Sequence, residues 1–406
     1  MFSGNKHPDH PEADELIAII YDGSYDVLEG CTFEVEPEPL QPDQEREASL
    51  FPEGKPETLN NMLVAIEKND IVLAKAILAS KDPDAKLDAD WYESALGTAV
   101  WLGNEEIVKD LLERDATVDG GLYNTCLQTS AYMGHKAITH LLLQRGANVN
   151  ARCGLYGSAL QAAAWAGNQG TVQIICDENA DVNAEGGRFS YPLIAAVYSG
   201  NINIVQLLLD RGANVNASGQ WGNWNTLRAA SRMGYSNIVE AILDKGADPN
   251  AEGGQYGTAL QAAAYGGHKD IVLTLLERGA NIDIADGENG SALHAAVYQG
   301  YRELAGTLLD RGADPDAKSG KYGNALHAAM SSSDRPMVEF LLEAGADVHG
   351  SCGYGNTLDA AIDLGEPEFV EILIDRGAWP SRPIRTPMMN VRNLLRRRGV
   401  DVAFDG

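Results

Sequence analysis

One repeating segment constrains the fold of this chain more than any other feature. It has the form Leu-Leu-x-x-Gly-Ala-(Asp/Asn)-x-(Asn/Asp), and successive copies lie 31 to 34 residues apart. A second pattern, Leu-x-Ala-Ala, keeps the same period. Its leucine falls at Leu96, Leu127, Leu160, Leu193, Leu227, Leu260, Leu293, Leu326 and Leu358. Two patterns that share one period over nine units indicate a repeat array, in which each unit buries its apolar face only by stacking on its neighbours.

Each unit reads as two short helices joined by a turn. The position two residues before the anchor leucine holds residues that cap helix N-termini: Ser94, Thr125, Ser158, Asn225, Thr258, Ser291, Asn324 and Asn356, with Tyr191 followed by Pro192 in one unit. An Ala-rich helix, a turn glycine, a second helix with apolar residues at helical spacing and a C-terminal glycine follow. We therefore predict an all-α solenoid of stacked helix-turn-helix units.

This pattern resembles the ankyrin repeat over most of the chain. The segments that begin Leu293-His294-Ala and Leu326-His327-Ala match the family's TPLHxA opening best. The resemblance implies hairpin loops that project from the stacked helices. The Leu260-Gln-Ala-Ala-Ala version, preceded by Gly253-Gly-Gln-Tyr-Gly, resembles ankyrin arrays of fungal signalling proteins of the NACHT-ankyrin type. In one respect the chain departs from the family: Tyr156, Tyr256 or Tyr322 holds the usual hairpin glycine position, and glycine comes one residue later.

The two ends of the array differ from its middle. Residues 1–57 carry 15 acidic and 3 basic residues with several prolines, which predicts a largely disordered leader. Its more apolar stretches, 16–20 and 27–35, are candidates for a short docking segment. We expect an N-terminal capping repeat over 58–90, nine repeats over 91–380, and a basic C-terminal capping helix and tail over 381–406. The tail is too short for the ubiquitin-ligase adaptor box that often follows ankyrin arrays.

Charge and cysteine content indicate the cellular compartment and the class of partner. The net charge is −27, of which −19 lies on residues 58–378. This charge opposes nucleic-acid binding and favours a basic protein segment as partner. Five cysteines without a CxxC pair fit a reducing compartment. With no signal peptide and no apolar run of membrane-spanning length visible, we expect a monomer without membrane or nucleic-acid partners, in the cytoplasm or the nucleus.

No known catalytic or metal-binding motif occurs in the sequence, so we expect no enzyme activity, no cofactor and no metal. The resemblance assigns structural hydrogen bonds to the histidines of two family positions: the TPLH position (His294, His327) and the turn (His135, His268). Asn150, Asn183, Asn216 and Asn250 close the repeated segment. Some ankyrin proteins are hydroxylated at this asparagine, but we favour turn asparagines bonded to their own backbone.

The strongest binding signal is the residue five positions after each anchor leucine, which we call the stripe. It holds Trp101, Tyr132, Trp165, Tyr198, Arg232, Tyr265 and Tyr298, followed by Ser331 and Asp363. Trp, Tyr and Arg are enriched at binding hot spots, and in the ankyrin family this position lies on the concave face. The alternative is that these rings fill space against the next repeat.

A second aromatic series lies four residues before the anchor leucine. It comprises Tyr92, Tyr123, Tyr156, Phe189, Tyr256, Tyr322 and Tyr354, interrupted by Asn223 and Asn289. For this series we favour a structural role, with neighbouring hairpins packing ring to ring. Trp221 and Trp224 fall in an atypical hairpin and are added to the candidate partner-binding residues.

The sequence thus predicts a non-catalytic protein-interaction module or scaffold that binds its partner on the concave and hairpin face. The alternative function is the recognition or autoinhibitory arm of a larger NACHT-type signalling NTPase, present here as a fragment or paralogue.

Overall fold

The computed structural model describes residues 57–79, 89–114, 116–118, 125–154, 156–219, 225–252, 257–285, 287, 290–318, 320, 323–352, 355–382, 384, 386 and 388–400. The leader expected over 1–57 therefore lies outside the described residues, apart from Glu57. The chain forms two compact units. The first comprises Met1–Asp181 with Gly186–Arg188, and the second comprises Val182–Glu185 with Phe189–Gly406.

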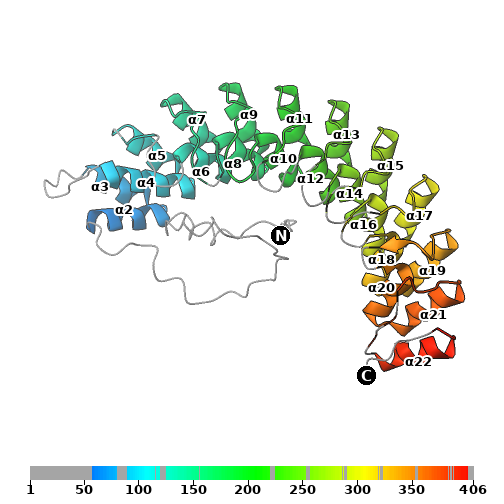
Figure 1. Ribbon diagram of the computed structural model, residues 1–406. Coiled ribbons are helices and arrows are strands. Elements are labelled where there is room, and N and C mark those ends of the chain that lie inside the picture. The colour runs from blue at the N-terminus through cyan, green and yellow to red at the C-terminus, as the bar shows by residue number, and fades with distance from the viewer. Residues whose placement is uncertain are drawn as a thin grey trace, which may run out of the picture. The chain divides into compact units, whose positions relative to one another are not determined.

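The first unit contains four helix pairs in its described part. They are α2 (Glu57–Glu67) with α3 (Ile71–Ala79), α4 (Ala89–Leu102) with α5 (Glu105–Leu112), α6 (Cys126–Met133) with α7 (Lys136–Gln144), and α8 (Ala159–Trp165) with α9 (Gln169–Asp177). The first helices α2, α4, α6 and α8 contact one another in chain order, and the second helices α3, α5, α7 and α9 do the same. Figure 1 shows these two rows side by side.

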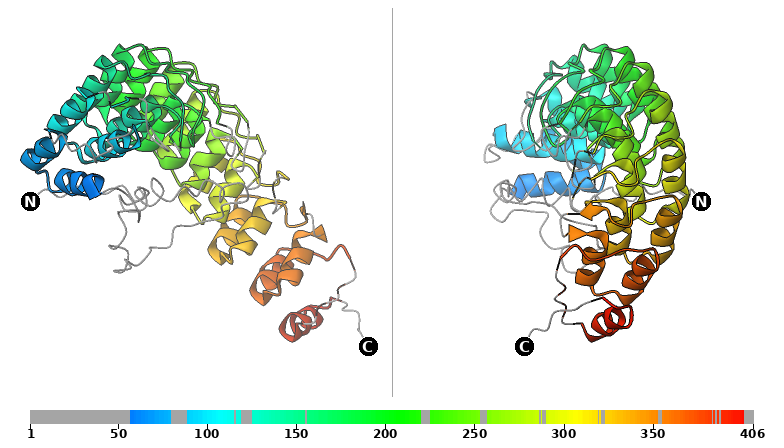
Figure 2. Two further views of the ribbon diagram at one scale, coloured as in Figure 1. Left: turned by 90° about the vertical axis from the view of Figure 1, so that its left-hand side faces the viewer. Right: turned by 45° about the vertical axis from the view of Figure 1, so that its right-hand side comes forward.

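The second unit continues the pattern. Its helices are α10 (Pro192–Ser199), α11 (Ile202–Asp210), α12 (Thr226–Met233), α13 (Ser236–Asp244), α14 (Ala259–Tyr265), α15 (Lys269–Glu277), α16 (Ala292–Tyr298), α17 (Arg302–Asp310), α18 (Ala325–Ser331), α19 (Arg335–Glu343), α20 (Thr357–Leu364), α21 (Pro367–Asp375) and α22 (Met389–Arg397). The first helices α10 to α20 again contact in order, and α22 packs on α21. Figure 2 shows α22 in red at this end of the unit. The predicted helical repeat array is confirmed.

Strand pairing in the described part is confined to the hairpin loops. The strands β1 (Ser351–Cys352) and β2 (Gly355–Asn356) pair antiparallel, with Ser351 opposite Asn356. A single bridge joins Cys153 to Gly157 in an earlier hairpin. Gly157 has a φ of +77°, a left-handed conformation that favours glycine. The glycine one residue later than the family pattern thus makes the hairpin turn.

Side-chain caps begin the first helices as predicted. Seven of the eight predicted caps accept a hydrogen bond from the backbone N–H three residues on: Thr125, Ser158, Asn225, Thr258, Ser291, Asn324 and Asn356. The prediction for Ser94 is wrong, because Ser94 lies inside α4, which begins at Ala89. The hairpin glycine that would interrupt a helix before Ser94 is absent from this unit, and the helix extends through Trp91 and Tyr92.

The core runs between the helix layers of each unit. Every anchor leucine is at most 2% exposed. The alanines that follow are equally buried, and their small side chains let adjacent first helices approach closely. At the turns, Gly134 has a φ of +75°, and a Cβ added there would lie 2.7 Å from Oδ1 of Asn168 in the next turn. The turn glycine is therefore required both by its backbone conformation and by the close approach of the following repeat.

Candidate functional site

The stripe lies at the C-terminal end of the first helices. In the first unit it comprises Trp101, Tyr132 and Trp165, and in the second unit Tyr198, Arg232, Tyr265 and Tyr298. All seven side chains are half-buried, in contrast to the fully buried anchor leucines five residues earlier. Of the last two members, Ser331 is half-buried and Asp363 is exposed. Each unit thus presents a row of partly accessible aromatic or arginine side chains.

The backbone of the stripe is held by the turn of the following repeat. The Nε2 atom of His135 lies 3.2 Å from the carbonyl oxygen of Trp101, and Nδ2 of Asn168 donates to the carbonyl of Tyr132 at 2.6 Å. In the second unit, Nε2 of His268 lies 3.1 Å from the carbonyl oxygen of Arg232. The structural hydrogen-bonding role expected for His135 and His268 is confirmed, and its effect is to fix where these stripe residues sit.

In the first unit, a stripe ring packs on a hairpin ring. Tyr132 and Tyr156 stack with centroids 4.9 Å apart and planes at 24°. Tyr156 is 6% exposed, and its hydroxyl interacts with that of Tyr132. Burial raises the pKa of both phenols, and more strongly for Tyr156. Both rings therefore stay neutral near physiological pH.

In the second unit, a hairpin ring contacts the stripe residue of its own repeat. Phe189 and Tyr198 lie 5.6 Å apart, centroid to centroid. The guanidinium of Arg232 lies 5.0 Å from the ring centroid of Tyr265, a cation–π distance. Tyr156 and Phe189 both contact first-helix residues of the stripe, a contact that the expected packing between neighbouring hairpins did not include.

Two expected site residues, Trp221 and Trp224, lie outside the described residues, as do the hairpin positions Tyr123, Asn223, Tyr256, Asn289, Tyr322 and Tyr354. The assignment of Tyr92 to a hairpin is wrong. Tyr92 lies within α4, where its ring meets that of Trp91 edge to face at 5.1 Å.

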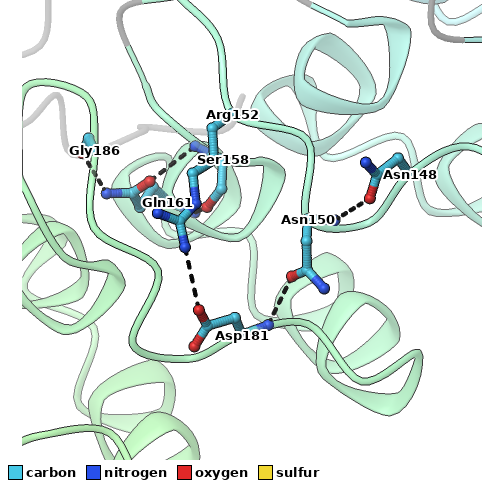
Figure 3. Close-up of polar contacts among 7 residues, drawn as sticks. All are labelled: Asn148, Asn150, Arg152, Ser158, Gln161, Asp181 and Gly186. Carbon is cyan, nitrogen blue, oxygen red and sulfur yellow. Dashed lines mark hydrogen bonds and ion pairs between the residues drawn. The ribbon is translucent and has the colours of Figure 1, made fainter.

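In several repeats, a buried polar residue directly after the anchor leucine ties the first helix to a hairpin. Figure 3 shows this for Gln161, whose Oε1 accepts from the backbone N–H of Ser158 at 2.8 Å while its Nε2 donates to the carbonyl of Gly186 at 2.6 Å. Gln128 binds the Gly157 carbonyl in the same way at 2.8 Å. Sequence reasoning missed these bridges, although a polar residue inside an apolar helix run was a visible signal.

In the second unit, three successive repeats hold Arg228, Gln261 and His294 at this position. Arg228 is 1% exposed, and its Nη1 donates to the carbonyl of Gly257 at 2.9 Å, while burial lowers its pKa to about 10. Gln261 donates to the Gly290 carbonyl at 2.5 Å. His294 is fully buried, contacts Ser291 and the backbone of Gly323, and has its pKa lowered to about 4 by burial. The structural role expected for His294 is confirmed.

The asparagines that close each repeated segment also link neighbouring loops. Oδ1 of Asn150 accepts from the backbone N–H of Asp181 at 2.8 Å, and Figure 3 shows this pair beside the ion pair of Arg152 with Asp181. In the second unit, Oδ1 of Asn183 accepts from the Asn214 N–H at 2.7 Å. The expectation that these asparagines bond to their own backbone is wrong. That role belongs to the residue two positions earlier, such as Asn148, whose Oδ1 accepts from the Asn150 N–H.

The described residues contain no group of three or more His, Cys, Asp or Glu side chains that could hold a metal ion. Among the described cysteines, Cys126, Cys153 and Cys176 are not joined in disulfides. Within the described part of the chain, every helix is too short or too polar to cross a bilayer.

Comparison with known proteins shows which family these repeats belong to. A family model described as ankyrin repeats in three copies matches residues 61–153, 96–186, 160–253 and 252–319, and the single ankyrin repeat model matches 324–351. The crystal structure of the human ASB11 ankyrin repeat domain is similar, with 27% sequence identity and a TM-score of 0.49, and the match covers 54% of this chain and 98% of that chain. No curated protein sequence matches. The family matches span well over half of the residues, and the chain belongs to the ankyrin repeat family.

Proposed function

We propose that this protein is a non-catalytic interaction module that binds another protein through the stripe. Ankyrin repeats generally mediate protein–protein interactions and generally lack enzymatic activity. One observation supports the stripe as the binding residues. Seven equivalent positions in succession hold Trp, Tyr or Arg side chains that are half-buried, so each is held in place and still offers accessible surface. Rigid aromatic side chains bind at a low entropic cost, which is why they dominate binding energy.

The hydrogen bonds behind the stripe support the same proposal. Because His135, Asn168 and His268 hold the backbone of three stripe residues, these positions need little ordering when a partner arrives. Stacking on Tyr156 likewise holds the ring of Tyr132 in place. Packing and partner binding are therefore compatible uses of one side chain, with one ring face turned to the hairpin and the remaining surface available.

Charge defines the partner that fits. Residues 58–378 carry a net charge of −19, which speeds encounter with a basic segment and opposes encounter with nucleic acid. We propose a partner that supplies a basic segment with apolar anchors for the stripe, bound by a monomer in the cytoplasm or nucleus. Trp221 and Trp224 stay candidates for the same partner.

The test is affinity capture from a native lysate, followed by quantification of the captured protein with purified components. Alanine at Trp101, Trp165 and Tyr198 together removes three anchors, and hot-spot truncations cost about 2 kcal/mol each, so capture falls by more than about a hundredfold. The matched control is Leu102→Ala, because Leu102 is 43% exposed and neighbours Trp101 but points in another direction. Unchanged capture by the triple variant, with an unchanged melting temperature, contradicts the proposal.

The second candidate is the ankyrin arm of a larger NACHT-type signalling protein. The segment Gly253-Gly-Gln-Tyr-Gly and the following Leu260-Gln-Ala-Ala-Ala favour it, because they resemble arrays of that class. The native mass of the protein in lysate distinguishes the two. Denaturing conditions remove non-covalent partners from the measured mass. A polypeptide that is still much heavier than the 43.5 kDa chain under these conditions supports the longer protein.

A further inference from the structure

The helix α3 is the second helix of the first described pair. It exposes a position that is buried in the second helices of all later pairs. This position is the third residue of each second helix. It is at most 2% exposed at Ile107, Ile138, Ile204 and Ile238, but Leu73 of α3 is 42% exposed. In the described part, α3 differs from the later second helices in having no earlier repeat beside it. The earlier repeat is therefore what normally covers this position.

The residue before Leu73 enlarges the exposed apolar face. Val72 is 81% exposed at a position that Glu106 and Asn203 occupy in later repeats. Ala76 is exposed as well, and positions 72, 73 and 76 share one side of a helix. A terminal repeat normally presents a polar outer face, because no further repeat covers it. The apolar side of α3 formed by Val72, Leu73 and Ala76, the α3 patch, departs from that rule.

We propose that the α3 patch is covered by the apolar segment of the same chain at residues 16–20, Leu-Ile-Ala-Ile-Ile. This segment is the longest unbroken run of aliphatic residues in the otherwise acidic first 57 residues. It reaches Glu57 at the start of α2 through 36 intervening residues. A chain of that length spans roughly 30 Å, against about 10 Å between packed helices. The connection is therefore long enough to place the segment on α3.

Charge favours this occupant over a second copy of the chain. Asp14, Glu15 and Asp22 flank the segment, whereas Lys68 lies just before α3 and Lys75 lies within α3, where it also pairs with Glu106 and Asp110. Two copies that met through their α3 patches would bring together chains with a net charge of −27 each, which repel. A tethered segment also acts at a high effective concentration, on the order of millimolar, without any need for a partner.

The experiment is hydrogen–deuterium exchange of the full-length protein, read in peptides that cover 16–21 and 71–79. In the wild type, the amides of 16–20 exchange about tenfold more slowly than an unstructured chain, because they are docked. Val72→Glu abolishes this protection. The replacement leaves the array folded, since Glu106 occupies the equivalent exposed position in the next repeat. The reciprocal variant, Ile17→Asp with Ile19→Asp, raises exchange in 71–79.

The matched control is Leu50→Asp, which places an acidic residue in the leader outside the aliphatic run and leaves both peptides unchanged. Three results overturn the proposal. The first is free exchange of 16–20 in the wild type. The second is protection of 16–20 that survives Val72→Glu. The third is protection that grows with protein concentration, because that result assigns the α3 patch to a second copy.

Discussion

The buried imidazole of His294 makes the stability of this protein depend on pH in a way that one substitution removes. His294 lies in the first turn of α16, fully buried, with Ser291 and the backbone of Gly323 as neighbours. Burial lowers its pKa to about 4, although Asp314 nearby acts in the opposite direction. The ring is therefore neutral in the folded protein at pH 5 and largely protonated in the unfolded chain, where its pKa is near 6.5.

The size of the effect follows from proton linkage. Because the unfolded chain binds the proton between pH 6.5 and pH 4 and the folded protein does not, stability falls as the pH falls through that window. At pH 5 the difference from the unfolded pKa is 1.5 units, so His294 alone costs about 2 kcal/mol relative to neutral pH. Below pH 4 the loss stops growing, because both states then carry the proton.

The variant His294→Gln isolates this contribution. Glutamine is a natural occupant of the position: Gln261 donates to the Gly290 carbonyl at 2.5 Å, and the amide of the variant can donate to Gly323 in the same way. Urea denaturation followed by circular dichroism at pH 7 and pH 5 gives the free energy of unfolding of both proteins. The wild type loses about 2 kcal/mol more than the variant between the two pH values.

Comparison of the two proteins cancels every other titrating group, including the large acidic excess. If both lose the same stability to within about 0.5 kcal/mol, the typical error of additivity, His294 is not held neutral by burial and the reasoning fails. An equal urea dependence of unfolding is required in both proteins, because a change in that slope signals a changed unfolded state.

Three further substitutions have outcomes that thermal and chemical denaturation can check. Gly134→Ala costs about 2 kcal/mol, because the left-handed φ and the 2.7 Å approach of Asn168 both disfavour a Cβ; a neutral result contradicts the interlocked turn. Gln161→Leu also costs about 2 kcal/mol, since it leaves the Gly186 carbonyl without its donor, and a stabilised variant is the contrary outcome. Ser333→Gly raises stability by about 1 kcal/mol, because Ser333 has a φ of +55° where other repeats carry glycine, and a loss of stability argues against strain there.

Local sequence patterns were sufficient to predict the repeat and most of its helix starts and turns. Ser158 precedes an Ala-rich run and caps it, and Gly134 ends a helix with a left-handed φ. These features depend on a few neighbouring residues, so a single sequence reveals them. Ser94 shows the limit. A capping residue type also tolerates a helix interior, and α4 continues past it to Ala89 because no glycine or hairpin interrupts it.

Contacts between repeats were the part that local pattern could not supply. Asn150 has the side chain for a local turn, yet it accepts from Asp181 in the next repeat, and Tyr156 packs on Tyr132 where a neighbouring hairpin was expected. Both partners belong to a neighbouring repeat and are chosen by the stacking geometry. The stripe itself was predicted as a set of positions. Only the structure shows that these side chains are half-buried, because Trp, Tyr and Arg occur both in protein cores and on surfaces.

Photo-crosslinking from the stripe tests the proposed function most directly. A photoreactive phenylalanine analogue replaces Trp165 in one variant and Gln173, on the second helix α9, in the other. Gln173 is the matched control, because it belongs to the same repeat and lies on α9, where its Nε2 donates to Oδ1 of Asp177 in the same helix. The proposal predicts a covalent adduct with the partner from position 165 and none from position 173. An adduct from position 173 alone would move the binding surface to the second-helix row and contradict the central claim.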